Sequence, residues 1–265
     1  MSGDHGLIIL NQPNSPFHTE TGGGIAHAAT YDHCAGVQCE AARVLLSLLP
    51  SMSPANILEP GCGTGLYTGF LLEAFPDAAL LGLDLCPSAL AVARGKYARR
   101  ATFLQADAER FAQGSYDLIT ANAVYHWFTD LVGSLARMHG MLSTGGSLAF
   151  SYFGPDSYRE LAESLNEVFG ASASVTCKRF AGSDALADML RAEFSHWTLE
   201  EMCFQQSFPS LPALLRNIRH TGTRGWNDST CQWTPCRLQQ VETAYRERFG
   251  SITVSYQVFF CGGQR

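Results

Sequence analysis

The stretch of sequence that decides the fold reads Ile57-Leu58-Glu59-Pro60-Gly61-Cys62-Gly63-Thr64-Gly65. It begins as an apolar strand candidate, Asn56–Glu59, and a helical pattern over Leu66–Ala74 follows at once. Glycines between a strand and a helix permit positive φ angles and let the backbone approach a ligand closely. The sequence therefore predicts a ligand-binding turn at the carboxyl end of a strand.

The chemistry of this turn favours a ligand with cationic groups. Its spacing is G-x-G-x-G, whereas the pyrophosphate-binding pattern is G-x-G-x-x-G. Glu59 directly precedes the glycines and would repel a pyrophosphate at the helix N-terminus. S-adenosylmethionine (SAM) carries a sulfonium, an ammonium and a carboxylate but no phosphate, and is the predicted cofactor.

Short apolar runs and helical patterns alternate on the carboxyl side of this turn. Further strands are predicted at Leu80–Asp84, Thr102–Gln105, Tyr116–Ala121 and Gly146–Tyr152, with helices at Ser88–Lys96 and Leu131–Leu142. Such alternation of buried strands with helices predicts an α/β fold. We expect a doubly wound, mostly parallel Rossmann-like sheet with helices on both faces and a helical insertion or lid.

The remaining patterns suggest four regions. They are an N-terminal arm with lid helices (1–50), a SAM-binding core (51–152), a helical insertion with the acceptor site (153–225), and a C-terminal helix and strand that complete the sheet (226–265). Beyond the core, helices are predicted at Ser157–Phe169, Ser183–Glu193, Leu211–Thr221 and Arg237–Phe249, and strands at Trp197–Gln205 and Thr253–Phe260.

Polar residues stand at successive predicted strand ends, where this fold binds ligands. Asp84 can accept hydrogen bonds from ribose hydroxyls, and Leu85 offers an apolar face to adenine. Asp107 can accept from the adenine amino group while the backbone of Ala108 contacts a ring nitrogen, and Asn122 ends the next strand. Helix capping is the alternative role for any one of these acidic residues.

Across residues 40–150 the sequence resembles class I SAM-dependent methyltransferases, most clearly over Leu58–Gly65. Together with the strand-end pattern, this resemblance yields the predicted cofactor-binding residues: Glu59, Gly61, Cys62, Gly63, Asp84, Leu85, Asp107, Ala108 and Asn122.

A narrower resemblance, to the malonyl-[acyl-carrier protein] O-methyltransferases of biotin synthesis, covers most of the chain. It rests on the segments Ala28–Gln38, Asn122–Trp127, Phe153–Leu161, Leu214–Gly222 and Thr253–Phe260. His126 stands where relatives often have Gln, and residues 223–226 replace a stretch that usually contains small residues. The resemblance implies esterification of the free carboxylate of a malonyl thioester, which masks its charge for chain-elongating enzymes.

A carboxylate acceptor is already ionised at neutral pH, so this reaction needs no general base. The sequence shows no acid–base motif, in agreement with that expectation. Tyr31 is the predicted group that orients the acceptor, with simple packing as the alternative. His126 is predicted in the acceptor pocket, with a structural role as the alternative.

The carrier protein, as an acidic partner, requires a basic docking surface. Lys178 and Arg179 lie in the predicted insertion, and Arg216 and Arg219 share one helix face. A further basic group, Arg94–Arg100, is more typical of a solvated face.

Composition limits the function classes. The net charge of −6 argues against non-specific nucleic-acid binding. The nine cysteines form no metal-binding spacing, so no metal is predicted. The absence of a signal peptide or membrane span predicts a cytoplasmic protein, and we expect it to be a monomer. Two alternatives remain: methylation of a small free acid, as in trans-aconitate methyltransferases, and a SAM-fold assembly factor or hydroxylase.

Overall fold

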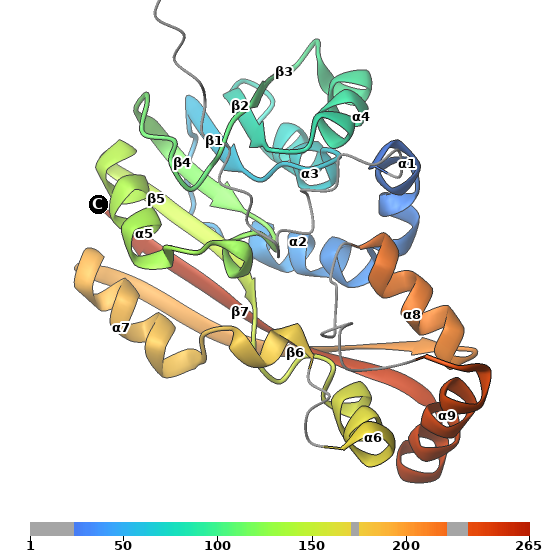
Figure 1. The fold of residues 1–265 in the computed structure, drawn as a ribbon. Coiled ribbons are helices and arrows are strands. Elements are labelled where there is room, and N and C mark those ends of the chain that lie inside the picture. Colours follow the sequence, from blue (N-terminus) through green and yellow to red (C-terminus); the bar gives the residue numbers. More distant parts are fainter. Residues whose placement is uncertain (1–23, 171–174, 222–232) are drawn as a thin grey trace, which may run out of the picture.

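The computed structural model describes residues 24–170, 175–221 and 233–265. Its centre is a seven-stranded sheet of order β3-β2-β1-β4-β5-β7-β6 (Figure 1). The strands are β1 Asn56–Pro60, β2 Ala79–Asp84, β3 Ala101–Gln105, β4 Tyr116–Ala121, β5 Leu142–Phe153, β6 His196–Phe208 and β7 Ile252–Gln264. Strands β1 to β5 pair in parallel, and β7 is antiparallel to both neighbours. The predicted fold class is confirmed.

Helices cover both faces of the sheet. Consecutive strand residues point to opposite sides, so apolar residues at consecutive positions need helices packed on both faces. Ile57 and Leu58 are both fully buried, yet they belong to different apolar clusters. The cluster around Ile57 includes α2 (Gly36–Leu48) and α3 (Leu66–Ala74), and the one around Leu58 includes α5 (Leu131–Met141) and α7 (Ser183–Glu193). Both faces of β1 are therefore dry, as in other doubly wound sheets.

Strands β6 and β7 form a long antiparallel pair, from His196 opposite Gln264 to Phe208 opposite Ile252. One end of this pair reaches beyond the parallel strands, where α6 (Arg159–Phe169), α8 (Leu211–His220) and α9 (Pro235–Phe249) gather (Figure 1). The predicted range 153–225 is thus only partly a helical insertion, because β6 is an edge strand of the same sheet. Its boundary at residue 225 lies outside the described residues and stays a prediction.

The N-terminal helical pattern forms two helices, α1 (Gly24–Cys34) and α2, which are separated at Ala35. Helix α1 lies against α4 (Pro87–Tyr97) and α8. Short 3₁₀ turns follow β4 (η1, Tyr125–Trp127) and precede α7 (η2, Thr176–Arg179). Residues 1–23, which make up most of the predicted N-terminal arm, lie outside the described residues. Among the helices that are described, none has the length and apolar character that crossing a bilayer requires.

Candidate active site

The glycine turn adopts the conformation that its sequence predicts. Gly61, Gly63 and Gly65 have φ angles of +66°, +54° and +81°. A Cβ added at Gly61 would also lie 2.5 Å from side-chain carbons of Val124, which follows β4. Backbone conformation and close packing against the β4 end therefore both require glycine at this position.

Glu59, at the carboxyl end of β1, is a buried carboxyl group with few polar partners to offset its loss of hydration. It is 2% exposed, and the Thr68 hydroxyl donates to its Oε2 at 2.6 Å. Burial raises the pKa of Glu59 to about 8, and the nearby charge of Asp84 adds to this effect. Within the described part of the chain no cation forms an ion pair with Glu59. An ammonium or sulfonium group would supply the missing positive charge.

Asp84, at the end of β2, connects that strand to the glycine turn. Its carboxylate accepts from the backbone N–H of Gly63 at 2.8 Å and of Cys86 at 2.7 Å. It is 7% exposed, and burial raises its pKa. The Cys62 side chain packs in an apolar cluster with Leu90 of α4, which leaves only its backbone for the predicted contact with the cofactor.

The predicted adenine-binding residues lie at the ends of β2 and β3. Leu85 is 39% exposed, which leaves its side chain accessible for the predicted contact with the adenine ring. Asp107 accepts from the backbone N–H of Glu109 at 3.0 Å and forms a 3.5 Å ion pair with Arg110, while Ala108 is buried. One Asp107 oxygen thus already caps a local turn, and its contact with adenine stays a prediction.

Asn122, after β4, is held by the protein itself. Its amide donates to the Gln38 carbonyl of α2 at 3.0 Å and accepts from the Ser151 hydroxyl of β5 at 2.7 Å. The Ser151 oxygen also accepts from the N–H of Ala123, which has a positive φ of 58°. This geometry favours a role for Asn122 in shaping the strand end, and its predicted contact with the cofactor stays untested.

Tyr31 lies in α1, close to the carboxyl edge of the sheet. Its pKa is raised by burial first, and then by the charges of Asp32 and Asp84. The phenol therefore stays protonated at neutral pH, and its hydroxyl can donate a hydrogen bond to an anionic acceptor. That role is a prediction that the geometry permits.

His126 lies in η1 and is 6% exposed. Among the described residues, four aromatic rings surround its imidazole, with centroids at 4.8 Å (Trp127), 5.8 Å (Tyr152), 5.1 Å (Phe153) and 5.0 Å (Phe180). Its Nδ1 has no hydrogen-bond partner among the described residues, and burial lowers its pKa to about 3. The imidazole is neutral at physiological pH and too weakly basic to serve as an efficient general base.

Three residues that the sequence analysis did not predict as site residues connect α1 with the glycine turn. The Thr64 hydroxyl donates to Asp32 Oδ1 at 2.5 Å, and Lys96 of α4 forms an ion pair with Asp32 Oδ2. Lys96 Nζ also donates to the Thr64 carbonyl at 3.0 Å. The signal in the sequence was only the position of Asp32 beside Tyr31, and nothing local connects it to Lys96.

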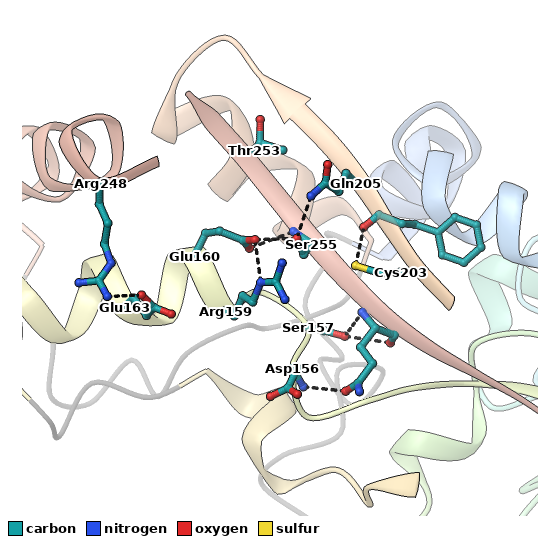
Figure 2. Close-up of polar contacts among 12 residues, drawn as sticks. Asp156, Ser157, Arg159, Glu160, Glu163, Cys203, Gln205, Arg248, Thr253 and Ser255 are labelled. Carbon is teal, nitrogen blue, oxygen red and sulfur yellow. Dashed lines mark hydrogen bonds and ion pairs between the residues drawn. The ribbon is translucent and has the colours of Figure 1, made fainter. Parts of the chain in front are cut away.

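The segment Phe153–Leu161, which carried part of the narrower resemblance, attaches α6 to β7 (Figure 2). The Glu160 carboxylate accepts from the Ser255 N–H at 2.9 Å, from the Ser255 hydroxyl at 2.6 Å and from Arg159 Nε at 3.1 Å. Ser157 donates to the Gln257 carbonyl and accepts from its N–H, each at 3.1 Å. These polar groups support the architecture next to the site and need no substrate as partner.

The predicted docking residues lie on two separate elements. Lys178 and Arg179 are exposed on η2, where Lys178 forms a 3.2 Å ion pair with Asp156. Arg216 and Arg219 are exposed on α8, and no ion pair involves either of them among the described residues. Their role in docking stays a prediction.

Comparisons with known proteins agree with this geometry. The methyltransferase-domain family pattern matches residues 58–150. A malonyl-[acyl-carrier protein] O-methyltransferase from Ilyobacter polytropus is 30% identical over 231 residues, 86% of this chain and 85% of that protein. The enzyme of the same name from Bacillus cereus is 29% identical, over 88% of this chain and 91% of that protein.

Solved structures of low sequence identity share the fold. The YcgJ protein from Bacillus subtilis has a TM-score of 0.57 at 16% identity, over 88% of this chain and 98% of that one. A phosphoethanolamine N-methyltransferase from Haemonchus contortus in complex with SAM has a TM-score of 0.57 at 16% identity, over 90% of this chain and 57% of that one. Given the extended similarity to the curated enzymes and the glycine turn with its acidic strand ends, the chain belongs to the malonyl-[acyl-carrier protein] O-methyltransferase family of SAM-dependent methyltransferases.

Proposed function

We propose that this protein transfers the methyl group of SAM to the free carboxylate of a malonyl thioester carried by acyl-carrier protein, an early step in making the pimeloyl part of biotin. The extended similarity to curated enzymes of that name supports the acceptor. The proposal places the protein in the cytoplasm, where its carrier-bound substrate is made.

One observation about the site carries the choice of a carboxylate acceptor. Neither of the two predicted acceptor-side groups can take up a proton at neutral pH, because the pKa of His126 is lowered to about 3 and the raised pKa of Tyr31 keeps its phenol protonated. An alcohol or ammonium acceptor would need its proton removed, whereas a carboxylate is ionised at neutral pH. The site therefore suits an acceptor that arrives already deprotonated.

In this reaction SAM supplies an electrophilic methyl group, and the protein supplies position and desolvation. Glu59 would hold the cationic part of the cofactor, and Asp84 its ribosyl part. The Tyr31 hydroxyl donates to the acceptor carboxylate, and the aromatic surroundings of His126 exclude water from the acyl chain.

Docking of the carrier protein is assigned to Arg216 and Arg219 of α8, with Arg179 on η2. These side chains are exposed and could meet the acidic surface of a carrier. A double charge reversal, Arg216→Glu with Arg219→Glu, should raise the KM for malonyl-carrier protein at least tenfold and leave the KM for malonyl-coenzyme A within twofold.

The test of the acceptor is a competition assay with purified protein, SAM and equal amounts of malonyl-carrier protein, malonyl-coenzyme A and free dicarboxylic acids. A mass gain of one methylene on the carrier-bound malonyl group is the expected result. Preferred methylation of a free acid would instead support the small-acid alternative. No SAM binding by calorimetry at millimolar SAM would point to an assembly factor.

A further inference from the structure

The contacts of Asp32 join three elements at one carboxylate. Its Oδ1 accepts from the hydroxyl of Thr64 in the glycine turn at 2.5 Å, and its Oδ2 pairs with Lys96 of α4. Lys96 completes the triangle by donating to the Thr64 carbonyl at 3.0 Å. The three residues, called here the α1 clasp, connect α1 directly to the cofactor-binding turn.

The opposite side of α1 is held by different chemistry. The Asn217 amide of α8 donates to the Cys34 carbonyl at 2.8 Å, and the Thr30 hydroxyl lies 2.9 Å from His220 Nδ1. No carboxylate takes part in either contact. Helix α1 is therefore attached to α8 by hydrogen bonds, to the glycine turn by the hydrogen bond from Thr64, and to α4 by the ion pair with Lys96.

The α1 clasp is open to solvent on one side. The side chains of Lys96 and Asp32 are 31% and 36% exposed, so ions in solution can reach the pair and weaken it. Tyr31 immediately precedes Asp32 in α1, and the charges of Asp32 and Asp84 both raise its pKa. A movement of α1 that separates Asp32 from Thr64 would therefore also displace Tyr31.

We propose that Asp32 and Lys96 are positioning residues that close α1 over the glycine turn, retain bound SAM and place Tyr31 next to it. This inference rests on the proposed function only in that the glycine turn binds SAM. It does not depend on which acceptor receives the methyl group.

The test compares SAM binding by the full-length wild-type protein with the variants Asp32→Asn and Lys96→Met, in the absence of acceptor. Loss of the charged contact should weaken SAM binding about tenfold, mainly through faster dissociation. Amide hydrogen exchange over residues 28–34 should become faster in both variants. In turnover assays, the KM for SAM should rise more than kcat falls.

Two matched variants separate positioning from general stability. Lys96→Arg keeps the positive charge and should retain SAM affinity within about twofold. Glu163→Gln removes a comparable half-exposed ion pair between α6 and α9, Glu163 with Arg248 at 2.6 Å, and should leave SAM binding unchanged (Figure 2).

Salt gives an independent measurement on the unmodified protein. Raising the ionic strength from about 0.05 M to 0.5 M should weaken SAM binding by the wild type more than by Asp32→Asn, because only the wild type has the pair to screen. Equal salt dependence, or SAM affinity and α1 exchange in Asp32→Asn equal to those of Glu163→Gln, would overturn the proposal. A failure of acceptor methylation alone would count against the proposed function and leave this inference intact.

Discussion

Two buried glutamates show how differently the same side chain is used in this molecule. Glu59 at the end of β1 is 2% exposed and accepts one side-chain hydrogen bond, from Thr68. Glu160 on α6 is 6% exposed and accepts from the Ser255 N–H, the Ser255 hydroxyl and Arg159. A buried carboxylate with its lone pairs satisfied is a structural contact, whereas one without a counter-charge is prepared for a ligand.

The contrast also separates the two motifs that suggested the function. Glu59, beside the glycine turn, forms no ion pair with any described residue, and we predict that a bound cofactor supplies the positive charge. The segment around Glu160 is complete within the protein, since α6 and β7 supply all of its described partners (Figure 2). Resemblance to the family at the glycine turn therefore bears on the chemistry of the protein. Resemblance at the segment around Glu160 bears on the architecture that supports the site.

The largest expected effect is the pH dependence of Glu59. Its pKa of about 8 in the folded protein lies above the ordinary value of 4.5, so between these pH values the folded state holds a proton that the unfolded state has released. The contribution of Glu59 to stability is therefore present at low pH and is lost as pH rises towards 8. At about 1.36 kcal/mol per pKa unit, the loss is at most about 5 kcal/mol.

Urea denaturation of the cofactor-free wild type and of Glu59→Gln, at several pH values from about 4.5 to 8.5, measures this loss. The variant cannot ionise, so the difference in unfolding free energy between the two proteins should change steadily in favour of the variant. A constant difference over this range would mean that Glu59 has a counter-charge after all, and the comparison with Glu160 would break.

The second prediction concerns Glu160. Glu160→Ala leaves the N–H and hydroxyl of Ser255 without their acceptor and should lower the free energy of unfolding by about 3 kcal/mol. SAM affinity of the folded variant should stay within twofold of wild type by calorimetry. The half-exposed Glu163 on the same helix supplies the control, and Glu163→Gln should cost under about 1 kcal/mol. Lost SAM binding in folded Glu160→Ala would contradict a purely structural role.

The third prediction concerns SAM affinity, where Glu59 and not Glu160 should matter. Glu59→Gln should weaken SAM binding by about ten- to thirtyfold, because a charge-assisted contact of about 1.5–2 kcal/mol becomes a neutral one. Calorimetry on folded protein at about pH 9, above the Glu59 pKa of about 8, measures the change, with Glu160→Gln as the matched substitution that should leave SAM affinity unaltered. Equal weakening by both variants would show that the loss is not specific to Glu59, and would contradict its predicted contact with the cofactor.

The smallest expected effect tests the completeness of the α6–β7 contact. Ser157→Ala removes a hydroxyl that both donates to and accepts from the Gln257 backbone at 3.1 Å. Each of these hydrogen bonds contributes about 0.5–1.5 kcal/mol, and neighbouring bonds partly compensate. The free energy of unfolding, measured by urea denaturation, should therefore fall by about 1 kcal/mol. An increase in the KM for SAM would instead assign this segment to the site.

The sequence predicted the parts of the fold that depend on short-range patterns. The strand candidates Asn56–Glu59 and Tyr116–Ala121 and the helix Leu66–Ala74 agree with β1, β4 and α3 almost residue by residue. Apolar runs flanked by turn residues report their own secondary structure. The edge strand β6 was predicted as a strand, but its place in the sheet was not, because its pairing with β7 joins residues far apart in the chain.

For the site, the sequence predicted which chemical groups gather but not how each is used. Asn122 and Asp107 were predicted beside the cofactor, and the structure shows that both already have partners in the protein. His126 was predicted in the acceptor pocket, and its burial among aromatic rings makes it neutral. Hydrogen bonding and burial depend on neighbours from other elements, so residue type and spacing could not determine them.

By itself, then, the sequence determined a parallel α/β sheet with a SAM-type glycine turn, because periodicity, turn chemistry and the charge of Glu59 are written in consecutive residues. Only the tertiary structure decided that Glu59 has no counter-charge among the described residues, that Glu160 accepts three hydrogen bonds, and that Asp32 reaches Lys96 and Thr64. The physical reason is that the free energy of a buried or paired charge depends on everything within a few ångströms, and those neighbours come from distant parts of the chain.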